Sequence, residues 1–70
     1  MRYRELARKL RRLGCKEIQR KSRGSHRKWF NPKTGQSSTI PDWGSKDLKR
    51  GTVRGFLRDL GIDPKDIGGI

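Results

Sequence analysis

The chain has 70 residues, 29% of them hydrophobic, and a formal net charge of +12. A chain this short buries only about 60% of the surface that its unfolded form exposes, so it can build one small core and one domain, residues 1–70. One Cys and one His are too few for an internal disulfide or a metal centre, and no apolar run has the length of a membrane span or a signal peptide. We therefore expect a cytoplasmic domain without metal or cofactor.

The positive charge is the strongest feature of the composition. Such a surface attracts polyanions, and nucleic acid is the most common polyanion in a cell. No stretch combines a basic face with the bulky apolar stripe that a membrane-surface helix needs. RNA or DNA is therefore a better expected partner than a membrane.

The first predicted element is a helix over residues 2–14. Its apolar residues recur every three or four positions, which places them on one helical face. They are Tyr3, Leu6, Ala7, Leu10 and Leu13. Gly14 follows where a left-handed residue ends a helix, and Cys15 can then fold back onto the apolar face as a small core residue.

The next 35 or so residues show no helical period. Residues 15–22 predict a strand with poor alternation, and residues 25–30 and 36–40 predict the two arms of a hairpin. Pro32 suits the second position of a type I turn, and Gly35 supplies a positive φ at the end of the loop.

A second helix is predicted over residues 51–61, ending at a glycine as the first one does. Its apolar positions are Val53, Phe56, Leu57 and Leu60. Asp63 as cap and Pro64 as first residue predict one further turn. Two helices with one apolar face each can lie on one side of a three-stranded antiparallel sheet, which gives an α+β domain of order α-β-β-β-α.

Strand alternation divides the central strand between two faces. His26, Lys28 and Phe30 share one face, and Arg27 and Trp29 share the other. Trp29 is a good filler for a small core, so we expect His26 on the open face. If Phe30 were the core residue instead, His26 would point inward.

His26 is the candidate catalytic residue, because histidine gains and loses a proton near neutral pH. RNA carries its own nucleophile, the 2′-hydroxyl, so cleavage needs a proton acceptor, a proton donor and nearby cations. Arg23, Arg27 and Lys28 can supply the cations. The alternative is that a lone histidine in a basic strand is only a surface residue.

A second basic cluster, Lys46, Lys49 and Arg50, lies at the start of the second helix. Helix N-termini attract phosphates, and cations are unfavourable there unless they bind something, so we expect phosphate contact. The alternative is a solvated helix start. Asp42 and Asp47 could act as acid or base partners, but an Asp near a helix start is ordinarily just a cap. Trp43 can cap the core edge or stack on a base.

These stretches together resemble the HicA-type (YcfA-like) toxins of toxin–antitoxin pairs. The resemblance rests on GSH at 24–26, NPKTG at 31–35, the strand closing on Pro41, and LKRGTVRGFL at 48–57, and it covers about residues 3–62. It implies a fold like the double-stranded-RNA-binding domain, a metal-independent mRNA interferase activity and a HicB-type antitoxin as partner. The catalytic histidine of the family matches His26.

The residues that we expect to bind RNA, taken from the basic clusters and the GSH stretch, are Arg23, Gly24, Ser25, Arg27, Lys28, Lys46, Lys49 and Arg50. One departure matters: many members have a second histidine just after the strand-three proline, where this chain has Asp42. Two other readings stay open: a non-catalytic RNA-binding module that grips duplex grooves, and a degenerate toxin that only pairs with its antitoxin. We expect the free protein to be a monomer.

Overall fold

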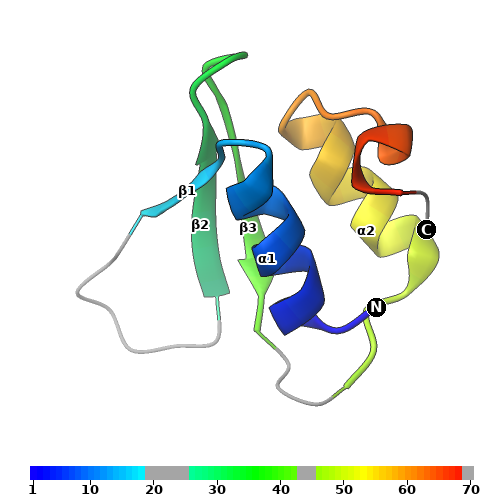
Figure 1. The fold of residues 1–70 in the computed structure, drawn as a ribbon. Helices are drawn as coiled ribbons and strands as arrows, with labels where there is room; N and C mark the ends of the chain where they lie inside the picture. Colours follow the sequence, from blue (N-terminus) through cyan, green and yellow to red (C-terminus); the bar gives the residue numbers. More distant parts are fainter. Residues whose placement is uncertain (19–25, 43–45, 69–70) are drawn as a thin grey trace.

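The computed structural model describes residues 1–18, 26–42 and 46–68, and these follow the predicted order of helix, three strands and helix (Figure 1). The elements are α1 (Tyr3–Arg12), β1 (Lys16–Ile18), β2 (His26–Asn31), β3 (Gln36–Pro41), α2 (Arg50–Asp59) and a short 3₁₀ helix, η1 (Pro64–Ile67). Within these described ranges, no helix has the length and apolar character needed to cross a bilayer. Of the strand predicted over 15–22, the structure assigns Lys16–Ile18, and the remainder lies mostly outside the described residues.

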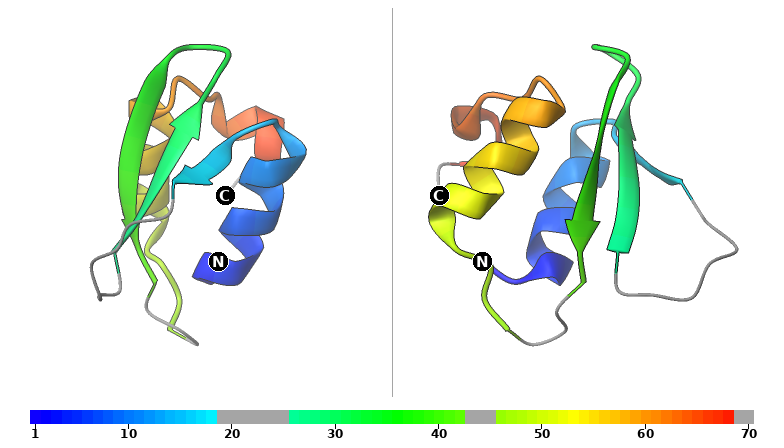
Figure 2. Two further views of the ribbon diagram at one scale, coloured as in Figure 1. Left: turned by 90° about the vertical axis from the view of Figure 1, so that its left-hand side faces the viewer. Right: turned by 180° about the vertical axis from the view of Figure 1, so that it is seen from behind.

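The three strands form one antiparallel sheet in the order β1-β2-β3. The register places Trp29 of β2 between Glu17 of β1 and Ser38 of β3. Both helices lie on the same side of this sheet, which gives two layers (Figure 2). The predicted α+β class and the predicted element order are therefore confirmed.

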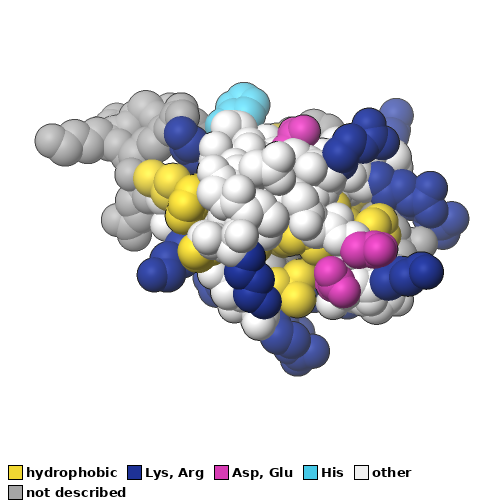
Figure 3. Space-filling model, turned by 90° about the horizontal axis from the view of Figure 1, so that it is seen from above, with side chains coloured by type: hydrophobic (Ala, Val, Ile, Leu, Met, Phe, Trp, Pro, Cys, Tyr) yellow, Lys and Arg dark blue, Asp and Glu magenta, His cyan; other side chains and the backbone are white. Residues whose placement is uncertain are grey.

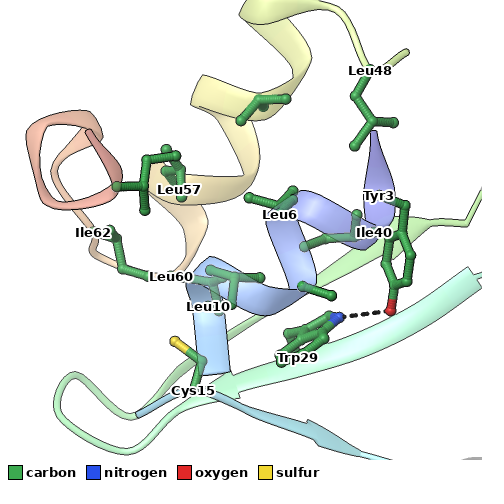
Figure 4. Packing of buried hydrophobic residues seen from close by; sticks show 13 residues of the cluster. Tyr3, Leu6, Leu10, Cys15, Trp29, Ile40, Leu48, Leu57, Leu60 and Ile62 are labelled. Atoms are coloured by element: carbon green, nitrogen blue, oxygen red, sulfur yellow. Dashed lines mark hydrogen bonds between the residues drawn. The ribbon is translucent and has the colours of Figure 1, made fainter. Parts of the chain in front are cut away.

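The core lies between the two layers, and its largest fully buried side chain is Trp29, which lies on the sheet side of the cluster (Figure 4). The other buried hydrophobic residues are Tyr3, Leu6, Ala7, Leu10, Cys15, Ile40, Leu48, Val53, Leu57, Leu60, Ile62 and Ile67. Leu13 and Phe56, which we placed on the apolar faces, pack against this cluster from its margin. Burying a large apolar side chain contributes about 1.5–3 kcal/mol, so these residues supply the main favourable term for folding.

Both helices end in the predicted way, at a glycine with positive φ. Gly14 has φ 90° and Gly61 has φ 69°. The next residue then donates its backbone N–H to the carbonyl five residues earlier, from Cys15 to Leu10 at 2.9 Å and from Ile62 to Leu57 at 2.8 Å. This hydrogen bond is typical of a Schellman motif, and it turns Cys15 and Ile62 into the core.

Asn31, at the end of β2, fastens the hairpin to the end of α2. Its side-chain Nδ2 donates to the Leu60 carbonyl at 2.7 Å, and its Oδ1 accepts from the Lys33 backbone N–H at 3.1 Å. Asn31 is buried, so this pairing satisfies a polar group that would otherwise be costly inside the protein. We did not predict this role, because the partner lies 29 residues away in the sequence.

Candidate functional site

His26 is the first residue of β2, and its side chain is exposed. Its partner across the ladder is Pro41, the last residue of β3. The neighbouring candidates Arg23, Gly24 and Ser25 lie outside the described residues, as does Trp43. The position of the imidazole at a strand end leaves it accessible to a large substrate.

The predicted division of β2 between two faces is confirmed. Trp29 and Asn31 point into the core, so His26, Lys28 and Phe30 point to the opposite side of the sheet. We call this side the open face. The register adds side chains from both neighbouring strands, and the described members are Lys16, Ile18, His26, Lys28, Phe30, Ser37, Thr39 and Pro41.

Arg27 points to the side of the sheet opposite His26, and two carboxylates lie near its guanidinium group. Its Nη1 is 4.0 Å from Glu17 Oε1, and its Nη2 is 3.8 Å from Asp42 Oδ2. The arginine side chain is about half exposed, so these pairs contribute little energy but do orient the group. Its role in RNA binding stays a prediction, now with two competing anions beside it.

Asp42 occupies the position where the resemblance implies a second histidine. It follows Pro41 directly, so it lies at the same end of the hairpin as His26. Its ion pair with Arg27 joins the end of β3 to the start of β2. In this chain the position therefore holds an anion that links the two strands.

A set of polar contacts connects this region to the core through Tyr3. The Trp29 indole Nε1–H donates to the Tyr3 hydroxyl at 3.2 Å, and that hydroxyl donates to Glu17 Oε1 at 3.1 Å. Burial raises the pKa of Tyr3, and the hydrogen bond from Trp29 partly opposes this rise. The Arg11 guanidinium lies 5.2 Å from the Trp29 ring centroid, where a cation–π contact is favourable. Sequence reasoning missed this set because its members come from α1, β1 and β2 and meet only when the helix packs on the sheet.

The second basic cluster lies around the start of α2. Lys49 is the N-cap residue, Arg50 is the first helical residue, and Lys46, like both of them, is exposed. The first turn of α2 has no acidic residue, and the Lys49 side chain makes no capping hydrogen bond. The first backbone N–H groups of a helix have no partner within it, and here the residues at the helix start, Lys49 and Arg50, are basic.

Our interpretation of Asp47 as the cap of α2 is wrong. Asp47 pairs with Arg2 through an isolated β-bridge, and its carboxylate Oδ1 is 3.6 Å from the Met1 amino group. The helix begins two residues later than a cap at Asp47 would require. The segment before α2 therefore packs against the start of the chain.

His26 and the second basic cluster lie at the same end of the molecule. The start of β2, the end of β3 and the N-termini of α1 and α2 all point to the lower end of Figure 1, and Figure 2 shows the same arrangement from two other directions. The N-terminus of α2 therefore adds its partial positive charge to Lys49 and Arg50, whereas the Asp47 carboxylate lies beside the Met1 amino group before α1. The start of α2 is the part of this end that is suited to an anionic ligand.

Side chains elsewhere offer less for catalysis. Cys15 is buried, and burial raises the pKa of its thiol, which confirms its prediction as a core residue and argues against a reactive thiol. Residues 1–18, 26–42 and 46–68 contain no group of three or more His, Cys, Asp or Glu that could hold a metal ion. Figure 3 shows Lys and Arg spread over the visible surface, with few acidic side chains among them.

Comparison with known proteins identifies the family of this chain. The model of the family described as "HicA toxin of bacterial toxin-antitoxin" matches residues 3–62, which covers every helix and strand from α1 to α2. Comparisons with curated proteins and with solved structures gave no match. The chain therefore belongs to the HicA toxin family, and it is the toxin of a toxin–antitoxin system.

Proposed function

We propose that this toxin is an endoribonuclease that cuts messenger RNA and that His26 transfers a proton in the reaction. The observation that carries the proposal is the placement of His26. It is exposed at a strand end, on the open face of the sheet, and Lys28 lies two residues along β2 on the same face. A phosphodiester that pairs with Lys28 can lie beside the imidazole.

The chemistry uses the 2′-hydroxyl of the RNA as nucleophile. The 2′-oxygen forms a bond to the adjacent phosphorus while the bond from phosphorus to the 5′-oxygen breaks. The hydroxyl proton passes to a base and the leaving 5′-oxygen receives a proton, so the products are a 2′,3′-cyclic phosphate and a 5′-hydroxyl. His26 can serve either transfer, and the surrounding cations stabilise the additional negative charge on the phosphoryl oxygens.

Cleavage of a labelled single-stranded RNA by purified protein tests the proposal. His26→Ala should lower the cleavage rate by about 10²–10⁴-fold, the usual contribution of a positioned acid or base. Lys33→Ala is the matched control, because Lys33 is an exposed residue in the turn at the other end of the hairpin. Cleavage fragments that carry 5′-phosphate ends, or an unchanged rate for His26→Ala, would refute the mechanism.

Growth after induced expression separates this activity from simple RNA binding. The native chain should arrest growth and degrade RNA, whereas folded His26→Ala should do neither. If both proteins arrest growth equally and RNA stays intact, the protein acts by binding, as a non-catalytic module of the same fold would.

We infer further that the partner is a HicB-type antitoxin with an acidic surface that covers His26. The net charge of +12 favours such a partner, and electrostatic steering mainly raises the rate of association. The association rate, measured by stopped-flow mixing, should therefore fall as ionic strength increases. A rate that is independent of salt would contradict this part of the proposal.

A further inference from the structure

We propose that the open face of the sheet is a platform for single-stranded RNA, on which one base stacks against Phe30. This inference rests on the proposed ribonuclease function and adds to it the kind of substrate and the residue that selects a base near the cut. No described helix covers this face, since both helices pack on the other side of the sheet (Figure 2).

Two apolar side chains on the open face do not belong to the hydrophobic core. Ile18 is 41% exposed, and among the residues that the structure describes it is the one large hydrophobic residue with an exposed side chain. Phe30 is partly exposed and belongs neither to the core cluster nor to the residues packed against it. Figure 3 shows hydrophobic side chains reaching the surface next to Lys and Arg. An aromatic ring in this position presents a flat apolar surface to a ligand.

The charges on the open face favour a polyanion as that ligand. Lys16 is the ladder partner of Phe30 on β1, and Lys28 is the ladder partner of Ile18 on β2. Directly opposed residues have Cβ atoms about 4.5–5.5 Å apart, so each apolar side chain has a cation next to it. The described members of this face include no Asp or Glu, because the carboxylate of β1, Glu17, points to the helical side.

Rings flanked by cations are typical of surfaces that bind single-stranded nucleic acid. The base stacks on the ring while the backbone phosphates pair with the lysines. The bases of a duplex are already stacked on each other and cannot lie on Phe30, so the platform selects single strands. An acidic protein could use the cations, but it would leave the aromatic surface without a specific partner.

The distance from the platform to His26 fits one short RNA segment. His26 and Phe30 are four residues apart on the same face of β2, which corresponds to about 13 Å. A base on Phe30 and a phosphate beside His26 can then belong to the same few nucleotides. Phe30 should therefore impose a base preference at a fixed distance from the cut.

Affinity for a fluorescent single-stranded RNA, measured by anisotropy in the non-cleaving His26→Ala background, tests the platform. Phe30→Leu keeps an apolar side chain but removes the ring, and it should weaken binding by about tenfold. Phe30→Trp should retain or improve binding. Lys16→Ala should weaken binding and reduce the slope of log affinity against log salt by about 0.7, as expected for one lost phosphate contact.

Arg58→Ala is the matched control, because Arg58 is an exposed cation in the last turn of α2, in the other layer of the molecule and away from the basic cluster at the start of that helix. It should change the affinity much less than Lys16→Ala does. A second measurement maps the cleavage sites of Phe30→Leu in a chain that keeps His26. A loss of stability alone would lower the amount of cleavage but would not change which sites are cut. Phe30→Leu should lose the base preference at one position beside the cut, while fragments keep the same end groups.

The outcomes separate this inference from the proposed function. If Phe30→Leu binds RNA and selects sites as the native chain does, the platform is wrong while the ribonuclease activity stands. If it instead weakens only the complex with the co-expressed antitoxin, the open face is a protein-docking surface and the platform is again wrong. If the native chain cuts no RNA, the proposed ribonuclease function is wrong. If it binds duplex and single-stranded RNA equally well, the single-strand platform is wrong, whether or not the protein cuts RNA.

Discussion

Replacement of Lys49 by Ser should make the protein more stable and a weaker RNA binder. Lys49 is the N-cap of α2, with an extended backbone (φ −66°, ψ 145°) and no side-chain hydrogen bond to the first turn. A serine in this conformation can accept a hydrogen bond from a free backbone N–H of that turn. The substitution also removes a cation from the positive end of the helix.

The magnitude follows from these two effects. A capping side chain stabilises by about 1 kcal/mol, and removal of an unfavourable charge at a helix end adds about 0.3–1 kcal/mol. The free energy of unfolding of Lys49→Ser should therefore exceed that of the native chain by about 1–2 kcal/mol. For a domain of this size, each kcal/mol raises the melting temperature by about 4–8 °C.

The cost should appear in RNA binding. One phosphate contact is lost, so the slope of log affinity against log salt should fall in magnitude by about 0.7 for single-stranded RNA. Urea titration gives the stability, and anisotropy over a series of salt concentrations gives the slope. Lys33→Ser is the control, since it removes the same charge from the exposed hairpin turn, which lies away from His26 and contacts the C-terminal end of α2 instead of its N-terminus.

Either of two results would refute this reasoning. A Lys49→Ser protein that is no more stable than the Lys33→Ser control would show that α2 gains nothing from a capping side chain. Unchanged affinity and salt slope would show that the cation at this helix end does not contact RNA.

Three further changes probe the core, a turn and an ion pair. Tyr3→Phe leaves the buried Trp29 indole N–H without its acceptor and should cost about 1–3 kcal/mol in urea unfolding. Because burial raises the pKa of Tyr3 from 10.0, the unfolded state loses this proton first; native stability should fall above pH 10, and fall less in the Phe variant. Gly61→Ala should lower the melting temperature more than Gly35→Ala. Both glycines have positive φ, but a Cβ at Gly61 would meet side-chain atoms 2.6 Å away, whereas the space at Gly35 is open. Asp42→Asn should cost less than about 1 kcal/mol, because its ion pair is partly exposed, and it should raise RNA affinity in anisotropy by removing an anion from the RNA-facing end.

The features that could be predicted from the sequence depend on near neighbours in the chain. Spacing of three and four residues predicted α1 and α2, and a glycine after each apolar face predicted where the helices end. Alternation in β2, together with the size of Trp29, predicted which face His26 occupies. These are local rules, so one segment is enough to apply them.

The features that only the tertiary structure decided depend on register between distant segments. The carboxylates beside Arg27 come from β1 and from the end of β3. Asp47 pairs with the start of the chain instead of capping α2, because the segment before that helix meets the first residues. Likewise, the pairing of Lys16 with Phe30 follows from the offset between two strands. Such contacts are set when the layers pack, and a shift of one residue would move each side chain to the other face.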